Sequence, residues 1–205
     1  MKKVIVLLSG GMDSTTVLGL IKKEKLDVLA LGFDYGQKHK TELKNAKKIA
    51  KYYDVPFKIL KLNFAQFFNK ETVIYKGKKI ISDDYLPFRN MIIFAITCGY
   101  AESKGYSEIY YGANADDVFP DNLKPFLIEF NKSLKSMETK IRLKYPLVNL
   151  SKKQVVELAN KLKVPLELTR SCYLNQVKSC GKCLACKKRL EGFKKAKISD
   201  KIDYC

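Results

Sequence analysis

The sequence predicts an α/β fold in which a parallel sheet of about five strands carries helices on both faces, with a small cysteine-rich appendage at the C-terminus. Two observations support this prediction. Short runs rich in β-branched residues and leucine alternate with longer amphipathic stretches along most of the chain, and parallel strands need crossover helices of that kind. Near the C-terminus, four cysteines then fall within 15 residues.

The first third of the chain predicts three strands and two helices. Residues 2–8 form a run rich in β-branched residues and leucine that is too short for a helix, which favours a buried parallel strand. Two glycines follow at once, and residues 13–23 then have apolar side chains at helical spacing. We expect a second strand at 28–34, a helix at 42–53 and a third strand at 57–62.

The middle of the chain has a weaker pattern, and we expect residues 63–84 to form an insertion or a flap with a small hairpin at 72–81. Residues 89–103 are apolar on most sides, which is typical of a buried helix. The remaining predicted elements are a strand at 107–112, a helix at 125–136, a short strand at 146–148, and an amphipathic helix at 151–163 with Ser151 as its N-cap.

Composition and length limit the possible classes of protein. With 205 residues, 46% of them hydrophobic, the chain can bury one full core. Its longest apolar runs fall far short of the roughly 18 residues that cross a bilayer, so we predict a cytoplasmic protein without a membrane partner. The net charge of +18 is compatible with nucleic-acid binding, but the lysines are spread over every segment. A solvated basic surface that attracts small anions is favoured, with nucleic acid as the alternative.

The turn between the first strand and the first helix reads Ser-Gly-Gly-Met-Asp-Ser at residues 9–14. At this position, unpaired helix amides and the positive end of the helix dipole face an incoming anion. The glycines let the backbone approach a phosphate without a Cβ clash, and the hydroxyls of Ser9 and Ser14 can donate to the same oxygens. We interpret the turn as a phosphate site, with an ordinary βα turn as the alternative. It lacks the spaced glycines of dinucleotide sites and the lysine of the Walker loop.

Four cysteines near the C-terminus follow the spacing C-x7-C-x2-C-x2-C, and they are Cys172, Cys180, Cys183 and Cys186. Thiolates this close together suit tetrahedral zinc, and a site closed by four cysteines is structural. An iron–sulfur cluster is the alternative. Cys98, within the apolar helix, is expected to be a buried small hydrophobic residue and not a nucleophile. Cys205 is the last residue, where chains are poorly ordered.

Three further strings stand out beside the turn at residues 9–14. They are Asp-Tyr-Gly-Gln-Lys-His at 34–39, Pro-Phe-Arg-Asn at 87–90, and the cysteine run that begins Ser-Cys-Tyr at 171. In this order, the four strings resemble the 7-cyano-7-deazaguanine synthase family, and the resemblance spans nearly the whole chain. It implies an ATP-binding PP-loop domain at residues 1–165, Rossmann-like and of the HUP type found among adenine-nucleotide α-hydrolases. It also implies a zinc-binding segment at residues 166–205, packed on that domain.

The same resemblance implies an enzyme of queuosine biosynthesis that forms a C–N bond. Such an enzyme converts 7-carboxy-7-deazaguanine and ammonia to the nitrile 7-cyano-7-deazaguanine. It adenylates the acid, ammonia displaces AMP to give an amide, and the amide is adenylated before AMP leaves again. Two ATP, used with magnesium, therefore yield AMP and pyrophosphate. Activation is needed because hydroxide is a poor leaving group and AMP a good one. A homodimer is also expected from the family.

The resemblance also implies which residues form the site. For ATP binding, with Asp13 also near the magnesium, they are Leu8, Ser9, Gly10, Gly11, Met12, Asp13, Ser14, Thr15 and Thr16. The implied catalytic residues are Asp13, His39 and Arg89. The implied substrate-binding residues are Gln37, His39, Arg89, Asn90, Asp116 and Asp121, with Asp117 on the same side. A surface histidine and surface acids are the alternative interpretations of His39 and the aspartates.

One segment departs from the family's pattern. Residues 114–122 are shorter than the expected loop and lack the cysteine that ends it. Because that loop is expected to contact the base, one alternative is a relative that stops at the amide or passes the activated deazaguanine to a nucleic acid or a protein amine. Further alternatives are a tRNA-modifying PP-loop enzyme and a basic zinc-ribbon binding module, although the glycine turn disfavours the binding module.

Overall fold

The structure of the 205-residue chain is a computed structural model. It describes residues 1–37, 40–67, 73–75, 78–80, 86–174 and 178–205. Within these residues, no helix has both the length and the apolar character needed to cross a membrane. The predicted hairpin is confirmed as two short antiparallel strands, β4 (Val73–Tyr75) and β5 (Lys78–Ile80).

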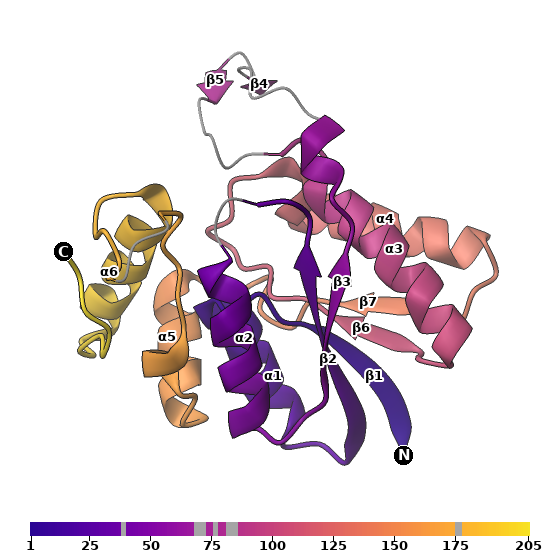
Figure 1. Ribbon diagram of the computed structural model, residues 1–205, viewed down its shortest axis with the longest axis horizontal. Coiled ribbons are helices and arrows are strands. Elements are labelled where there is room, and N and C mark those ends of the chain that lie inside the picture. Colours follow the sequence, from indigo (N-terminus) through magenta and orange to yellow (C-terminus); the bar gives the residue numbers. More distant parts are fainter. Residues whose placement is uncertain (38–39, 68–72, 76–77, 81–85, 175–177) are drawn as a thin grey trace.

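A five-stranded parallel sheet forms the centre of the molecule (Figure 1). Its strand order is β3-β2-β1-β6-β7, and every neighbouring pair is parallel. The strands are β1 (Lys2–Leu7), β2 (Leu26–Asp34), β3 (Phe57–Lys61), β6 (Glu108–Tyr110) and β7 (Arg142–Lys144). The last four residues of the central strand β1 are apolar and buried, as a strand covered on both faces requires.

Helices cover both faces of the sheet, and the predicted fold class is confirmed. The covering helices are α1 (Met12–Ile21), α2 (Thr41–Tyr52), α3 (Arg89–Lys104), α4 (Lys124–Ser136) and α5 (Lys152–Lys161). Successive side chains of a strand point to opposite faces, and β1 follows this rule. Ile5 and Leu7 pack into a core with α3 and α4, whereas Val4 and Val6 pack into a second core with α1, α2 and α5.

The fifth strand does not lie where the sequence pattern places it. The predicted strand at 146–148 is wrong, because this segment forms a turn and β7 precedes it. Pro146 has no N–H for a ladder bond, and the N–H of Val148 donates to the carbonyl of Tyr145 at 3.1 Å, which closes a tight turn. Leu147 is fully buried in the second core, which explains why a turn has the apolar character of a strand.

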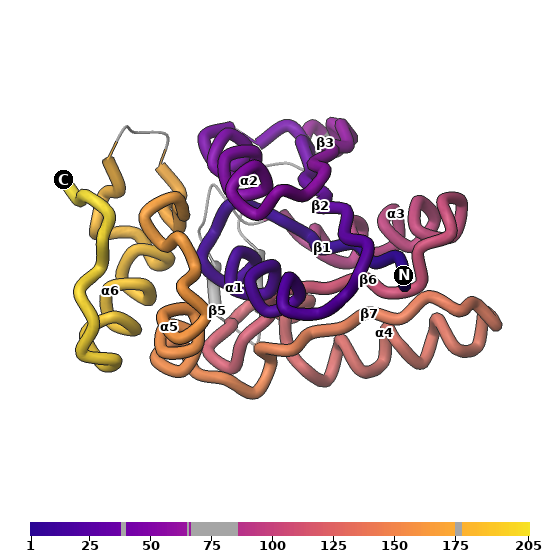
Figure 2. Tube along the Cα trace, turned by 90° about the horizontal axis from the view of Figure 1, so that it is seen from below, coloured from indigo at the N-terminus to yellow at the C-terminus, as the bar shows by residue number. Residues whose placement is uncertain are grey.

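A helix that the sequence pattern did not indicate, α6 (Leu184–Ala196), follows the cysteines. Figures 1 and 2 both show it beside α5 at one end of the molecule, where the C-terminus also lies. Met12, Val156 and Phe193 meet in a third core that joins this end to the sheet domain. Single turns of 3-10 helix occupy Phe64–Phe67, Pro120–Asn122 and Leu166–Leu168.

The order of the strands indicates at which edge of the sheet a ligand would bind. The chain runs from β1 outward to β2 and β3, and then crosses to β6 and β7 on the other side of β1. The strand order therefore reverses between β1 and β6. In open parallel sheets, ligands bind outside the carboxyl ends of the strands at such a switch point.

Candidate active site

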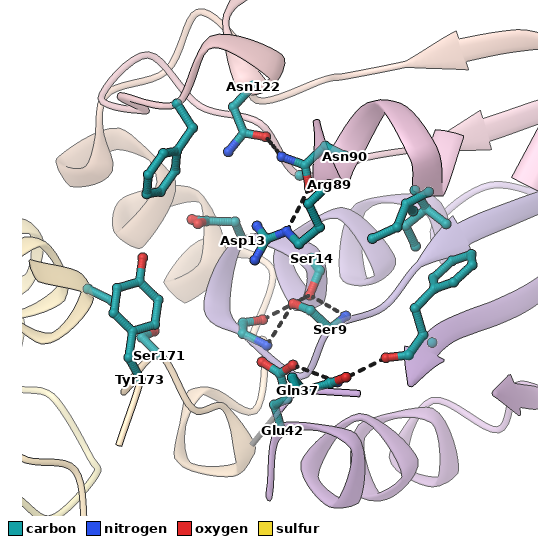
Figure 3. Close-up of a pocket in the computed structure, with 18 of the residues that line it drawn as sticks. Ser9, Asp13, Ser14, Gln37, Glu42, Arg89, Asn90, Asn122, Ser171 and Tyr173 are labelled. Carbon is teal, nitrogen blue, oxygen red and sulfur yellow. Dashed lines mark hydrogen bonds between the residues drawn. The ribbon is translucent and has the colours of Figure 1, made fainter. Parts of the chain in front are cut away.

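The carboxyl ends of β1, β2 and β6 border a cavity of about 600 Å³, a size typical of small-molecule sites. Its walls come from the turn after β1, the residues after β2, the start of α3, the loop after β6, and the cysteine segment (residues 171–186). Figure 3 shows side chains from these separate parts of the chain around one space, among them Asp13, Arg89 and Tyr173.

The phosphate turn (residues 9–14) has a backbone that only glycine allows. Gly10 has a φ of +85°, and a Cβ at this position would lie 2.3 Å from the carbonyl oxygen of Glu42. Gly11 is the N-cap of α1, and its N–H donates to Ser9 Oγ at 3.3 Å. The next amides belong to the first turn of α1, where N–H groups have no carbonyl partner within the helix. N–H groups in this position can bind an anion.

The nine residues expected at ATP divide into three groups. Six of them line the cavity, and they are Leu8, Ser9, Gly11, Met12, Asp13 and Ser14. Gly10 shapes the turn without lining it. Thr15 and Thr16 are fully buried, and their hydroxyls donate to the carbonyls one turn back at 2.7 and 2.8 Å. The structure therefore places these two threonines inside α1 and not on the cavity.

Asp13 is paired with a lysine that the sequence pattern did not single out. Lys152 Nζ lies 2.7 and 2.9 Å from the two carboxylate oxygens of Asp13, and the lysine side chain is 13% exposed. Lys152 is the first residue of α5, immediately after the N-cap Ser151. The predicted cap is confirmed, since Ser151 and Gln154 form a reciprocal capping box. Among 39 lysines and arginines, no local signal distinguishes Lys152.

A second carboxylate faces the same region from the loop after β6. Asp117 lines the cavity and accepts the N–H of Asn114 at 3.0 Å. Burial raises the pKa of its carboxyl to about 6, and the charge of Asp13 adds to the rise. Burial also lowers the pKa of Lys188 from α6, which lines the cavity close to these acids. Two carboxylates and two lysines thus share one partly desolvated end of the cavity.

Arg89 enters the cavity at the start of α3. Its guanidinium lies 5.9 Å from the ring centre of Tyr35, and Nη1 donates to the Tyr35 hydroxyl at 3.5 Å. Burial opposes the charge of Arg89, but Tyr35, Tyr111 and Glu42 hold its pKa above the ordinary value. A permanently charged fork in a half-buried site suits a carboxylate or a phosphate.

Gln37 also lines the cavity. Its amide nitrogen donates to the carbonyl of Phe33 at 3.0 Å and to Glu42 at 3.3 Å, and its oxygen accepts the N–H of Tyr35. Gln37 therefore holds the chain after β2 against the start of α2. His39, which was expected beside it, lies outside the described residues.

The remaining acids expected at the substrate act on the protein backbone instead. Asp121 accepts the N–H of Asn90 at 2.8 Å and its side-chain nitrogen at 3.2 Å, which anchors the start of α3. Asp116 accepts the N–H of Lys152 at 2.6 Å, at the start of α5. Neither aspartate lines the cavity, whereas Asn90 does. Both carboxylates hold helices that deliver cations to the site.

The four expected cysteines converge. The sulfurs of Cys172, Cys180, Cys183 and Cys186 all lie within 4.8 Å of one another. Gly181 has a φ of +68°, the left-handed turn that brings the sulfurs together. Burial works against a thiolate at Cys180, but the N–H groups of Cys183 and Lys182 donate to its sulfur and lower its pKa to about 6. This donor set can bind a metal ion.

The cysteine segment is part of the cavity wall. Cys172 and Tyr173 line the cavity, and the N–H of Arg170 donates to the carbonyl of Gly10 at 2.9 Å. Behind the segment, the fully buried Arg189 forms an ion pair with Asp200 at 2.7 Å and fixes the C-terminal residues on α6. A metal in this segment would therefore stabilise one wall of the site.

The comparison with protein families decides the identity. A sequence profile for the family described as queuosine biosynthesis protein QueC matches residues 3–197, nearly the whole chain. The chain belongs to the QueC family. Relatives that cover nearly the whole chain are named as synthases, so the chain is an enzyme.

Three relatives of this QueC-family chain are named 7-cyano-7-deazaguanine synthase. The protein of Thermoplasma volcanium is 38% identical, with 99% of this chain and 91% of the relative covered. That of Acetivibrio thermocellus is also 38% identical, with coverages of 100% and 98%. That of Nautilia profundicola is 39% identical, with coverages of 100% and 99%.

Solved structures with lower sequence identity share the fold. The U34-tRNA thiolase NcsA from Methanococcus maripaludis, with its [4Fe-4S] cluster, gives a TM-score of 0.59 at 21% identity and covers 93% of this chain and 63% of its own. The NH3-dependent NAD synthetase from Campylobacter jejuni gives 0.52 at 19% identity, with coverages of 82% and 66%. These likenesses concern the fold alone.

Proposed function

We propose that the chain converts 7-carboxy-7-deazaguanine and ammonia to 7-cyano-7-deazaguanine, with two ATP cleaved to AMP and pyrophosphate. The observation that carries this proposal is the phosphate turn of a QueC-family chain opening on the same cavity as Arg89. A group that holds pyrophosphate and a group that holds a carboxylate then lie at one site. The reaction requires this arrangement, because the acid must attack the α-phosphorus while pyrophosphate leaves.

At the ATP end, we propose that the first-turn amides of α1 and the hydroxyls of Ser9 and Ser14 hold the pyrophosphate. The two hydroxyls lie 3.1 Å apart, so both can reach one phosphate group. Lys152 and Lys188 add positive charge beside the turn. Asp13 suits magnesium, which prefers carboxylate oxygens, and magnesium bound there would offset charge on the leaving group. Lys152 must then exchange its partner from Asp13 to a phosphate oxygen.

At the acid end, we propose that Arg89 pairs with the substrate carboxylate and orients one oxygen toward the α-phosphorus. That oxygen forms the bond to phosphorus, and the bond to pyrophosphate breaks. Ammonia then attacks the acyl carbon, AMP leaves with the former carboxylate oxygen, and a proton is released. The amide oxygen then attacks the α-phosphorus of a second ATP and pyrophosphate leaves. Without a second ammonia, loss of AMP and a proton from this adenylated amide leaves the nitrile. Both adenylations need the same two groups, so one cavity serves both.

For the cysteine segment, we propose one structural zinc. With Zn–S bonds of about 2.3 Å, a tetrahedral site separates its sulfurs by about 3.8 Å, close to the 3.9 Å between Cys180 and Cys186. In a four-iron cluster each thiolate binds a different iron, so the sulfurs stand further apart. We also propose the division into an ATP-binding domain at 1–165 and a zinc-binding segment at 166–205. A homodimer and a cytoplasmic location stay predictions.

The proposal is tested by mixing the purified chain with ATP, magnesium, 7-carboxy-7-deazaguanine and ammonia. We expect AMP and pyrophosphate to appear in equal amounts, with two AMP for each nitrile found by mass spectrometry. A product that stops at the amide would limit the function to the first half of the reaction. AMP that forms only after tRNA is added would replace the proposal by a tRNA-modifying function.

A further inference from the structure

Asn122 sits at the cavity in a hydrogen-bonded chain that fixes which way its amide points. The chain begins at Asp121, whose carboxylate can only accept when ionised. It takes the backbone N–H of Asn90 at 2.8 Å and the side-chain nitrogen of Asn90 at 3.2 Å. The amide of Asn90 therefore has its NH2 group on this side and its oxygen on the other, where Arg89 Nε donates to it at 3.4 Å.

The same NH2 group determines the orientation of Asn122. Asn90 Nδ2 lies 2.6 Å from Asn122 Oδ1, and a donor at this distance requires an acceptor opposite it. The hydroxyl of Tyr111 donates to the same oxygen. With its oxygen held by two donors, Asn122 must turn its NH2 group away from Asn90, and Figure 3 shows the nitrogen on the side away from that bond.

The NH2 group of Asn122 has no acceptor among the residues that the structure describes. The residue is nevertheless only 8% exposed, and it lines the cavity. The nitrogen itself is open to the cavity, because Tyr53 Oη is the one buried side-chain nitrogen or oxygen without a partner in the described part of the chain. A rigid donor held at a ligand site gains its partner when the ligand binds. The ligand should therefore present a hydrogen-bond acceptor at this place.

The charges around Asn122 indicate a neutral acceptor. The charges of Asp117, Arg89 and Asp121 all act on Tyr111, whose hydroxyl contacts Asn122. The two acids disfavour an anionic group here, and the one cation, Arg89, is the partner proposed for the substrate carboxylate. A 7-deazaguanine ring has two neutral acceptors, N3 and the ring carbonyl oxygen. The carbonyl oxygen lies on the same edge of the ring as the 7-carboxylate assigned to Arg89, whereas N3 lies on the far side, so the carbonyl oxygen is the acceptor that fits.

We propose that Asn122 determines substrate specificity by donating a hydrogen bond to the ring carbonyl oxygen of the 7-deazaguanine substrate. This inference rests on the proposed function for the identity of the substrate. It assigns the loop before α4 to recognition of the base, at the end of the cavity where Asp121, Asn90 and Tyr111 hold the amide in place. A substrate with an amino group at the same ring position would meet donor against donor.

The test compares two ligands and three proteins by calorimetry, with α,β-methylene-ATP and magnesium present. The ligands are 7-carboxy-7-deazaguanine and its analogue with an amino group in place of the ring carbonyl. We expect the wild type to bind the carbonyl ligand about 10- to 100-fold more tightly. Asn122→Asp keeps the oxygen that accepts from Asn90 and Tyr111 but replaces the donor by an acceptor, so the preference should reverse. Asn122→Ala should abolish the preference.

Several outcomes would overturn the inference. One is a wild type that does not distinguish the two ligands, and this measurement stands even if Asn122→Asp fails to fold. Another is an equal loss for both ligands in Asn122→Asp, which would make the residue merely structural. Binding of α,β-methylene-ATP, which Asn122 is not expected to contact, serves as the control for folding. If the carbonyl preference is found but no AMP forms, the proposed reaction fails while this inference stands.

Discussion

Two walls of the cavity, the phosphate turn and the cysteine segment, differ in what stabilises them. The phosphate turn follows β1 and precedes α1, so two buried cores hold it from both sides of the sheet. The cysteine segment lies opposite, and its own cluster consists of the cysteines and Tyr204. The N–H of Arg170, bonded to the carbonyl of Gly10, joins the two walls.

Because of this difference, the two walls should respond differently to mutation. A wall made of backbone held by a large core keeps its shape without help, and its side chains are free to bind and react. A wall with little apolar core needs another source of free energy, and a bound metal can supply it. Changes at the cysteine segment should therefore act first on folding, and changes at the phosphate turn first on turnover.

The largest expected effect follows removal of one metal ligand. Cys186→Ser should release the metal, whose binding is worth on the order of 10 kcal/mol in comparable sites, and residues 166–205 should become sensitive to proteases. Limited proteolysis and elemental analysis measure both effects. Cys205→Ser is the matched control, because Cys205 is exposed and lies outside the cluster. One zinc per chain is expected, and iron in its place would contradict the zinc assignment.

The next largest effect is expected at Asp13, and it concerns mainly the rate of the reaction. Asp13→Ala should lower the rate of AMP formation by about 10³-fold or more, because the charge on the leaving pyrophosphate loses its metal partner. The melting temperature should fall only modestly, since Asp13 is partly exposed and Lys152, which loses its partner, still lies near the charge of Asp117. Asp13→Asn keeps the shape of the side chain and should lose activity to a similar degree. Turnover near the wild-type rate in either variant would contradict the assigned site.

A smaller effect, with a defined pH dependence, is expected at Asp117. Its pKa is raised from 3.8 to about 6, so the folded state holds a proton that the unfolded state releases. The contribution of Asp117 to stability should therefore fall as pH rises from about 4 to about 6. Asp117→Asn has no such loss and should be more stable by about 1–2 kcal/mol above pH 6, less than full linkage because the carboxyl is partly solvated. Urea unfolding at pH 5 and pH 8 measures this, and an equal difference at both values would refute it.

The smallest effect is at the start of α5, which delivers Lys152 to the phosphate turn. Ser151→Ala removes the capping box and should lower the free energy of unfolding by about 1 kcal/mol. Ser133→Ala on α4 is the matched control, because its exposed hydroxyl bonds only within its own helix. No difference in denaturant midpoint between the two variants would remove the cap as a determinant of this helix.

The sequence predicts those features that local rules determine. Only glycine fits at position 10, because φ is positive there and α2 lies in close contact. The phosphate turn can therefore be predicted from its residues alone. The metal-ligand cluster and the cap at Ser151 can also be predicted, because each depends on the spacing of a few neighbouring residues. The strand at 146–148 is not, because Leu147 is buried by a turn as fully as it would be by a strand.

Features assembled from several elements could not be predicted. Lys152 and Lys188 become distinct from other lysines only when α5 and α6 pack beside the phosphate turn. The acids of the loop at 114–122 looked equivalent in the sequence, yet Asp117 lines the cavity while Asp116 and Asp121 hold helix starts. The orientation of Asn122 depends on contacts with two other elements, which no local pattern encodes.

The central claim is that the substrate acid is joined to AMP at the phosphate turn. Its most direct test uses 7-carboxy-7-deazaguanine with ¹⁸O in both carboxylate oxygens, and mass spectrometry of the AMP formed. Each oxygen should leave on one of the two AMP molecules, so both carry a single ¹⁸O in the phosphate. AMP without the label would contradict the account, because the acid would then not have been activated as an adenylate.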